Sequence, residues 1–449
     1  MKHLVLKSIS LSLLLFLTVQ SFAQDVKYRR SSLTMILLES ETFPNKEMVM
    51  NSWNNYPFPD KYNKHDINQK TVNINNLTLT DEDMLKKGLL KDTLKSELAI
   101  SLATAGGLRS VKYLNNENTV AVLLPTEKEE TQLKIDKYIS ESKLANRLVA
   151  KWFNKSADGK MDMSVIQERG FYNASEMEAS IAKGQTRGTS SLGDAGEELI
   201  RNTFVTFTRL NFYENEPIAR MIRDAAILQT QKSLAGKPQI AIDLAMKGIE
   251  KIYEKTKEGY SIWSKTWLYR LNWNDSISTI FYNDLWSKSA EFDKSDLFSL
   301  EFVGVQYNQS LVTFKLGETR TQDQIIDLGV VRNVDNAFAK LQKQNDVFKP
   351  KVPVLTSGPI TAQIGMKEGL SGGEKFDVLE LTVSPKTGYS EYKKVGTVKV
   401  DKKVIWDNRY NAGGKPEAEQ VDKEGKPINA TKFSGGKKIM PGMLLKQVK

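Results

Sequence analysis

Histidine and cysteine, the side chains that most often bind metals or activate nucleophiles, are almost missing from this sequence. The 449 residues include no cysteine and two histidines, of which only His65 lies beyond the first few residues. A zinc site would therefore depend on carboxylates, and a Ser-His-Asp triad would have to use His65. Because asparagines, lysines and prolines surround His65, we expect it in a surface loop. The sequence predicts no catalytic residue, no cofactor-binding residue and no metal ligand, and hence a protein that is not an enzyme.

Carboxylates are the one kind of catalytic side chain that is plentiful. Asp194, Glu197 and Glu198 follow one another closely in the segment LGDAGEEL. Two carboxylates at a suitable distance can hydrolyse a glycosidic bond. Acids at the start of a helix also stabilise the positive end of the helix dipole. We expect this structural role, and keep a carbohydrate-active enzyme as the weakest alternative.

A glycine-rich segment raises the question of nucleotide binding. Residues 369–375 are GLSGGEK, and LSGGE differs in one position from the LSGGQ signature of ABC-transporter ATPases. That signature acts on a nucleotide held by a Walker A loop, and the chain contains no G-x-x-x-x-G-K-[ST] sequence. Glycines supply positive φ angles, and the residues that follow alternate as in a strand. We therefore predict a turn between two β-strands.

The first 23 residues have the features of a cleaved signal peptide. Lys2 and Lys7 accompany an apolar run, and small residues follow at Ser21 and Ala23. The run is short for a bilayer core of about 30 Å, so a retained membrane anchor is the weaker alternative. Export of a chain without cysteine suits the periplasm of a Gram-negative bacterium. We expect a periplasmic protein, with the inner face of the outer membrane as a more specific location.

The positive charge of the chain is spread widely. The formal net charge is +10, and loss of Lys2 and Lys7 with the signal peptide lowers it to +8. Segments such as EKIYEKTKEG mix bases with acids, which is typical of solvated helix faces. We therefore expect no nucleic-acid partner.

Hydrophobic periodicity predicts an α+β fold with a central α/β layer. Residues 24–130 should form an N-terminal α+β region, with a helix over 80–102 and a hairpin over 108–124. Residues 131–347 should form the central domain. Its first half alternates between the two element types, with a helix over 131–154, a strand over 162–170, a short helix at Ser175 and a strand over 203–213.

The second half of the chain has a different pattern. Two helices should begin near Pro217 and Pro238, followed by an antiparallel meander over 263–316 and a helix over 334–347. Residues 348–359 contain three prolines and are the predicted linker. Residues 360–449 alternate short strand patterns with turn residues. They predict a small C-terminal SH3-like β-barrel.

An aromatic strand is the candidate contact surface. Trp267, Tyr269 and Trp273 fall on one face of the segment TWLYRLNW. An exposed aromatic row can stack on sugar rings or lie at a membrane interface. A core face packed under the two preceding helices would have the same pattern. We favour the core interpretation and keep this face as the leading candidate for a contact surface.

One segment resembles a known family. LANRLVAKWFNKSADGKMDMSVIQERGFYNASEME, followed by AGEELIRNTFVTFTRLNFY, resembles the periplasmic domain of curli-type secretion-channel subunits. In that family a helix leads into a strand that ends in the equivalents of Glu168, Arg169 and Gly170, and a short helix and another strand follow. The resemblance covers residues 141–213 and implies an α/β fold there.

We expect a non-enzymatic periplasmic envelope protein that binds or scaffolds other envelope components. Its partner would be an envelope protein or another envelope component, with the C-terminal barrel as a docking module. The alternative is an oligomeric outer-membrane secretion channel, or a channel accessory related to curli-type export. In that case residues 266–286 would form a membrane hairpin. Homo-oligomerisation and a peripheral association with the outer membrane are compatible with both hypotheses.

Overall fold

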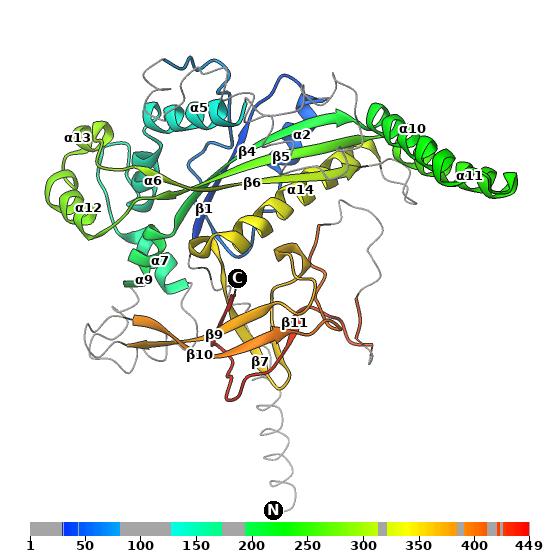
Figure 1. The fold of residues 1–449 in the computed structure, drawn as a ribbon. Helices are drawn as coiled ribbons and strands as arrows, with labels where there is room; N and C mark the ends of the chain where they lie inside the picture. Colours follow the sequence, from blue (N-terminus) through cyan, green and yellow to red (C-terminus); the bar gives the residue numbers. More distant parts are fainter. Residues whose placement is uncertain are drawn as a thin grey trace, which may run out of the picture.

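The computed structural model describes residues 29, 31–43, 45–80, 127–172, 194–312, 321–383, 390–410, 420–422 and 425–448 (Figure 1). The predicted signal peptide, nearly all of the helix over 80–102, the hairpin over 108–124 and the short helix at Ser175 lie outside the described residues. The chain is α+β, with one open sheet and one closed barrel, each of six strands. Among the described residues, no helix is both long and apolar enough to cross a membrane.

The open sheet combines segments from distant parts of the chain. Its order is β2-β1-β4-β5-β6, and β3 also pairs with β1. The strands are β1 (Ser32–Leu38), β2 (Asn63–Lys64), β3 (Thr71–Val72), β4 (Thr203–Glu214), β5 (Tyr260–Leu271) and β6 (Leu300–Val312). β1 is parallel to β2, β3 and β4, whereas β4, β5 and β6 are antiparallel. The predicted N-terminal region and central domain therefore share one sheet.

Helices cover both faces of this sheet, which explains the composition of its strands. β1 has the sequence SLTMILL and is buried on both faces, as expected of a strand between parallel neighbours. α2 (Lys46–Asn54) and α14 (Gln322–Gln344) pack on one face, where Leu33, Phe204 and Leu268 belong to the core. α5 (Glu127–Glu141) and α6 (Leu144–Trp152) pack on the other.

Two predictions around α5 and α6 need correction. The helix predicted over 131–154 is broken, because Lys143 adopts a left-handed φ of 49° between α5 and α6. The strand predicted over 162–170 is wrong, since Glu168 and Arg169 lie in the helix α7 (Ser164–Tyr172). The Asp162 carboxylate accepts the Ser164 backbone N–H at 2.8 Å, which favours a helix start at this point. The strand predicted over 203–213 is confirmed as β4.

The meander predicted over 263–316 is wrong in its middle part. Between β5 and β6 the chain forms α12 (Asp275–Ile280), a turn of π-helix η4 (Phe281–Leu285) and α13 (Ser289–Lys294). Ile277, Phe281 and Leu285 are four residues apart and all buried, which is a helical spacing. The Asn274 side chain caps α12 by accepting the Ile277 N–H. The membrane hairpin proposed for residues 266–286 is therefore a strand followed by helices.

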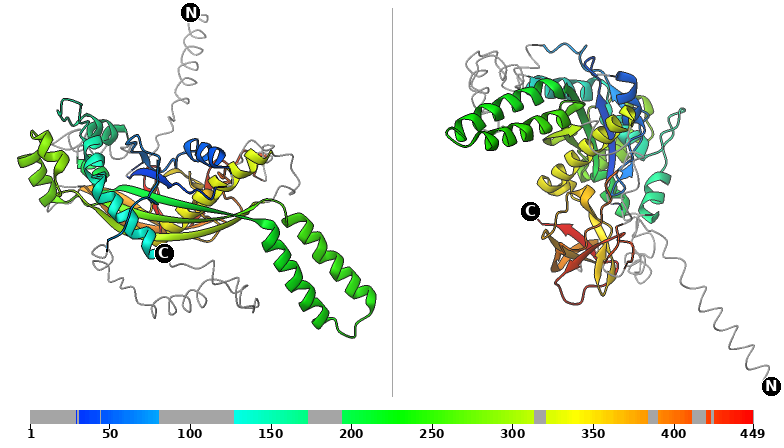
Figure 2. Two further views of the ribbon diagram at one scale, coloured as in Figure 1. Left: turned by 90° about the horizontal axis from the view of Figure 1, so that it is seen from above. Right: turned by 90° about the vertical axis from the view of Figure 1, so that its right-hand side faces the viewer.

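A helical hairpin extends from the end of the sheet. The helices α10 (Asn215–Ser233) and α11 (Gln239–Thr256) connect β4 to β5 and project beyond the sheet as an arm (Figures 1 and 2). Both predicted helices are thus present. α14 is longer than the predicted helix over 334–347, because a capping box of Thr321 and Gln324 starts it earlier.

The C-terminal residues form the closed barrel, below the sheet in Figure 1. Its strands are β7 (Lys351–Ser357), β8 (Ile360–Ala362), β9 (Lys375–Val383), β10 (Ser390–Val400), β11 (Thr431–Ser434) and β12 (Leu444–Gln447). The predicted linker 348–359 is wrong, because it contains β7. Val352 and Val354 point into the barrel core on either side of Pro353. The prolines made this alternation of inward-facing and outward-facing residues hard to recognise in the sequence.

The glycine-rich segment is a turn, as predicted. It joins β8 to β9 after the short helix η6 (Met366–Glu368). Gly369, Gly372 and Gly373 have φ angles of 79°, 108° and 98°, which other residues rarely adopt. The Glu374 carboxylate accepts the backbone N–H groups of Ser371 and Gly372. The acid thus closes the turn.

Candidate functional site

The predicted aromatic contact surface is buried. Trp267, Tyr269 and Trp273 are at most 5% exposed. The first two lie in the core beneath α5 and α6, not beneath α10 and α11. Trp273 belongs to a second cluster with Phe281 and Phe298, and its indole N–H donates to Glu197 at 3.0 Å. These side chains are core, so the interpretation as a contact surface is wrong.

His65 is also buried, although a surface position was predicted. The imidazole lies 4.8 Å from the Trp152 ring, and its Nε2 is 2.9 Å from the Leu148 carbonyl oxygen. Nδ1 is 3.0 Å from the Arg169 guanidinium. Burial and the charge of Arg169 lower the pKa of His65 to about 3. The neutral ring therefore donates a hydrogen bond from Nε2 and accepts one at Nδ1. These bonds link α6 and α7 to the residue that follows β2.

Two carboxylates of α9 (Asp194–Arg201) have structural partners. Glu197 accepts the Trp273 indole N–H. Glu198 accepts from the Lys351 ammonium at 2.9 Å and from the Tyr392 hydroxyl at 3.0 Å. These bonds connect the sheet to the barrel. Within the described ranges, no group of three or more histidine, aspartate or glutamate side chains could hold a metal ion.

A buried acid lies where α14 meets the barrel. Asp335 accepts a 2.5 Å hydrogen bond from the Tyr56 hydroxyl, and its other carboxylate oxygen is buried without a hydrogen bond. Lys367 of η6 is 3.6 Å away. Burial raises the pKa of Asp335 to about 6, with Lys367 opposing the shift and Glu368 adding to it. This group can change its charge near neutral pH.

The arm of α10 and α11 carries several exposed apolar side chains. Ile240 and Leu244 of α11 are 82% and 72% exposed, and none of the residues of α11 is fully buried. On the arm, more than half of the surface is also exposed for Ile222, Leu228 and Ile252. Ile240 and Leu244 are four residues apart and are neighbours on the helix surface, whereas Ile252 follows eight residues later and is rotated by about 80° from Leu244. We call these three residues the arm stripe.

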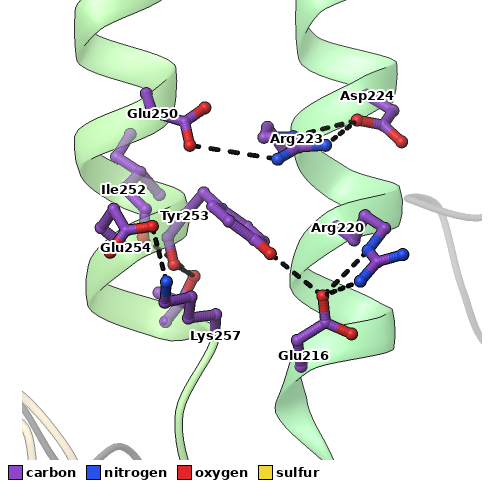
Figure 3. Close-up of polar contacts among 10 residues, drawn as sticks. Glu216, Arg220, Arg223, Asp224, Glu250, Ile252, Tyr253, Glu254 and Lys257 are labelled. Carbon is purple, nitrogen blue, oxygen red and sulfur yellow. Dashed lines mark hydrogen bonds and ion pairs between the residues drawn. The ribbon is translucent and has the colours of Figure 1, made fainter.

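Polar contacts hold the two helices of the arm together (Figure 3). The Tyr253 hydroxyl of α11 donates to Glu216 of α10 at 3.0 Å, and the Arg223 guanidinium covers the Tyr253 ring at 4.5 Å. Arg220 donates two hydrogen bonds to the same Glu216 oxygen. Hydrogen bonds from Arg220 and Tyr253 lower the pKa of Glu216. These polar contacts join α10 to α11 without involving the side chains of the arm stripe.

Sequence reasoning did not find the arm stripe. A Cβ atom added at Gly248 would meet nothing within 4 Å, so this glycine does not admit a neighbouring helix. The available signal was the four-residue spacing of Ile240 and Leu244, on a helix that already has apolar residues facing α10. An apolar pattern on two sides of an exposed helix indicates a second contact.

Comparison with known proteins adds no family to this description. No family model matches the chain, and none of the curated proteins matches it significantly.

Proposed function

We propose that this chain is a non-enzymatic periplasmic protein that binds or scaffolds another component of the cell envelope. The arm of α10 and α11 is its contact surface. The N-terminal sequence supports export, and the absence of cysteine is consistent with a fold held by its cores alone. We further propose an SH3-like barrel that acts as a docking module; its short strands and small size support this.

The exposed arm stripe is the observation that carries the proposal. A helix of a globular protein normally buries one apolar side, and α11 directs a second one to solvent. Three lysines, Lys247, Lys251 and Lys255, lie at the same four-residue spacing. They lie on the same side of the helix as Ile240 and Leu244, further towards its C-terminus, so this surface fits an apolar pocket with acidic groups beside it.

Site-specific photocrosslinking tests the proposal. A photoreactive residue in place of Leu244 should capture one defined envelope component in intact cells that produce the protein. The same residue in place of Ile280, which is 43% exposed at the other end of the sheet, is the control. If both positions capture the same set of proteins, or neither captures any, the arm is not a contact surface.

The second candidate is an oligomeric outer-membrane secretion channel or a channel accessory. The same arm supports it, because an exposed apolar helix can also be covered by other copies of the chain. The resemblance to curli-type subunits adds limited support, since Glu168 and Arg169 lie on a helix here. If washing membranes with concentrated salt releases all of the protein, this candidate is eliminated.

A further inference from the structure

A cavity lined by lysines lies at the joint between the sheet and the barrel. Its volume is about 210 Å³. It is formed by the residue before β1, the loop before β2, the start of β4, the segment before β7, and β7 and β12. The lining side chains that carry charge are Lys61, Asp346, Lys349, Lys351 and Lys446. Four cations therefore face one carboxylate.

The lysines are held in place by ion pairs around the cavity. Lys349, whose side chain is 1% exposed, lies 2.9 Å from one oxygen of Asp346, and Lys446 lies 2.8 Å from the other. Lys61 pairs with Asp60 at 2.8 Å. Ion pairs with Lys446 and Lys349 lower the pKa of Asp346 to about 2, so its carboxylate stays ionised. The Asp346 carboxylate thus forms ion pairs with both Lys349 and Lys446.

Two of the lysines are direct neighbours in the barrel. Lys351 of β7 is opposite Lys446 of β12 in the antiparallel pairing. Like charges at directly opposed positions destabilise a sheet. Glu198 and the face of the Tyr392 ring, 3.9 Å away, offset the charge of Lys351 from one side. When the ion-pair partners Asp60 and Glu198 are counted with Asp346, four lysines meet three carboxylates, so the positive charge around the cavity exceeds the negative charge by one.

We propose that this cavity binds a small anion of the phosphate or phosphoryl class. Lysine ammonium groups bind phosphate oxygens as point charges, and partial burial strengthens the attraction. The volume of the cavity accommodates a group of that size. Lys61 belongs to the sheet body and Lys446 to the barrel, so the bound anion also braces the joint between them.

Calorimetric titration of the full-length chain with inorganic phosphate and with pyrophosphate, at constant ionic strength, tests the proposal. We expect saturable one-site binding and a higher melting temperature, because a ligand of the native state stabilises it by mass action. Flotation with vesicles of phosphatidylglycerol and phosphatidylcholine distinguishes the source of the phosphate. If the protein floats with the vesicles and pyrophosphate abolishes this, the ligand is a lipid headgroup. If the titration shows binding but the protein does not float, the ligand is a free compound. Absence of saturable binding in both experiments overturns the proposal.

Matched lysine variants separate this site from general charge. Lys446→Met and Lys394→Met each remove a strand lysine that forms an ion pair with an aspartate, but only Lys446 lines the cavity. We expect Lys446→Met to weaken binding about tenfold or more, and Lys394→Met to change it less than about twofold. If Lys446→Met does not fold, Lys61→Met takes its place. It changes a lysine on the opposite wall of the cavity and should weaken binding by a similar factor. Equal losses in the cavity and control variants would mean that the anion binds to general surface charge.

Discussion

At the residue scale, two buried titratable groups make the stability of the fold depend on pH in opposite directions. His65 is neutral in the folded protein and Asp335 has a carboxyl that burial favours in its protonated form. Neither could be assigned from the sequence. His65 contacts Leu148 and Arg169, which are 83 and 104 positions away, so its polar sequence neighbours gave the wrong environment.

His65 should make the fold sensitive to mild acid. Its folded-state pKa of about 3 is below its usual value of 6.5, so its contribution to stability is present above pH 6.5 and is lost as the pH falls towards 3. The loss is up to about 1.4 kcal/mol per pH unit. Urea unfolding at several pH values between 7 and 4 should show a steeper loss for the wild type than for His65→Gln. Parallel pH profiles would show that the buried imidazole does not resist protonation.

Asp335 should act in the opposite direction. Its folded-state pKa of about 6 is above its usual 3.8, so the stability it contributes is present below pH 3.8 and is lost as the pH rises through 6. The substitution Asp335→Asn keeps an acceptor for the Tyr56 hydroxyl and removes the charge. We expect the stability of the variant relative to the wild type to rise between about pH 4 and pH 6, by up to about 1.4 kcal/mol per pH unit, and to level off at higher pH. A difference in unfolding free energy that does not vary with pH would contradict the assignment.

At the element scale, local signals found some elements and missed others for identifiable reasons. The β-branched residues of β4 and the prolines near the starts of α10 and α11 predicted these elements correctly. Pro353 and its neighbours concealed β7, which pairs with β12 about 90 positions away. In α12 and η4, residues with high strand propensity such as Ile277 and Phe281 follow a four-residue spacing, and the spacing decides the structure.

The π-helical turn should be a stability centre. Phe281 is fully buried and contacts Phe153, Trp273 and Phe298, whereas the adjacent Ile280 is 43% exposed. Phe281→Ala should lower the free energy of unfolding by roughly 3–5 kcal/mol, because it leaves a cavity in the core. Ile280→Ala should cost less than about 1 kcal/mol. Chemical unfolding of the two variants compares them directly, and equal losses would place Phe281 outside the core.

At the scale of the whole molecule, the α+β class was predictable and the arrangement was not. Periodicity indicated strands, helices and a C-terminal β-structure, and the barrel is present. β1 and β4 pair in one sheet although about 170 positions of sequence separate them. No local sequence pattern encodes such a pairing. The aromatic strand face was ambiguous for the same reason, since only tertiary packing shows that α5 and α6 cover it.

The central claim is that the protein acts through its projecting arm. A variant with Ile240→Ser, Leu244→Ser and Ile252→Ser removes the arm stripe but not the contacts between α10 and α11. Because these side chains are exposed, the melting temperature should stay close to that of the wild type.

Quantitative photocrosslinking from position 228, also on the arm, tests this claim most directly. We expect the captured envelope component to be lost in the triple serine variant and retained in wild type, at equal protein levels. Capture that is unchanged in the triple variant would contradict the account.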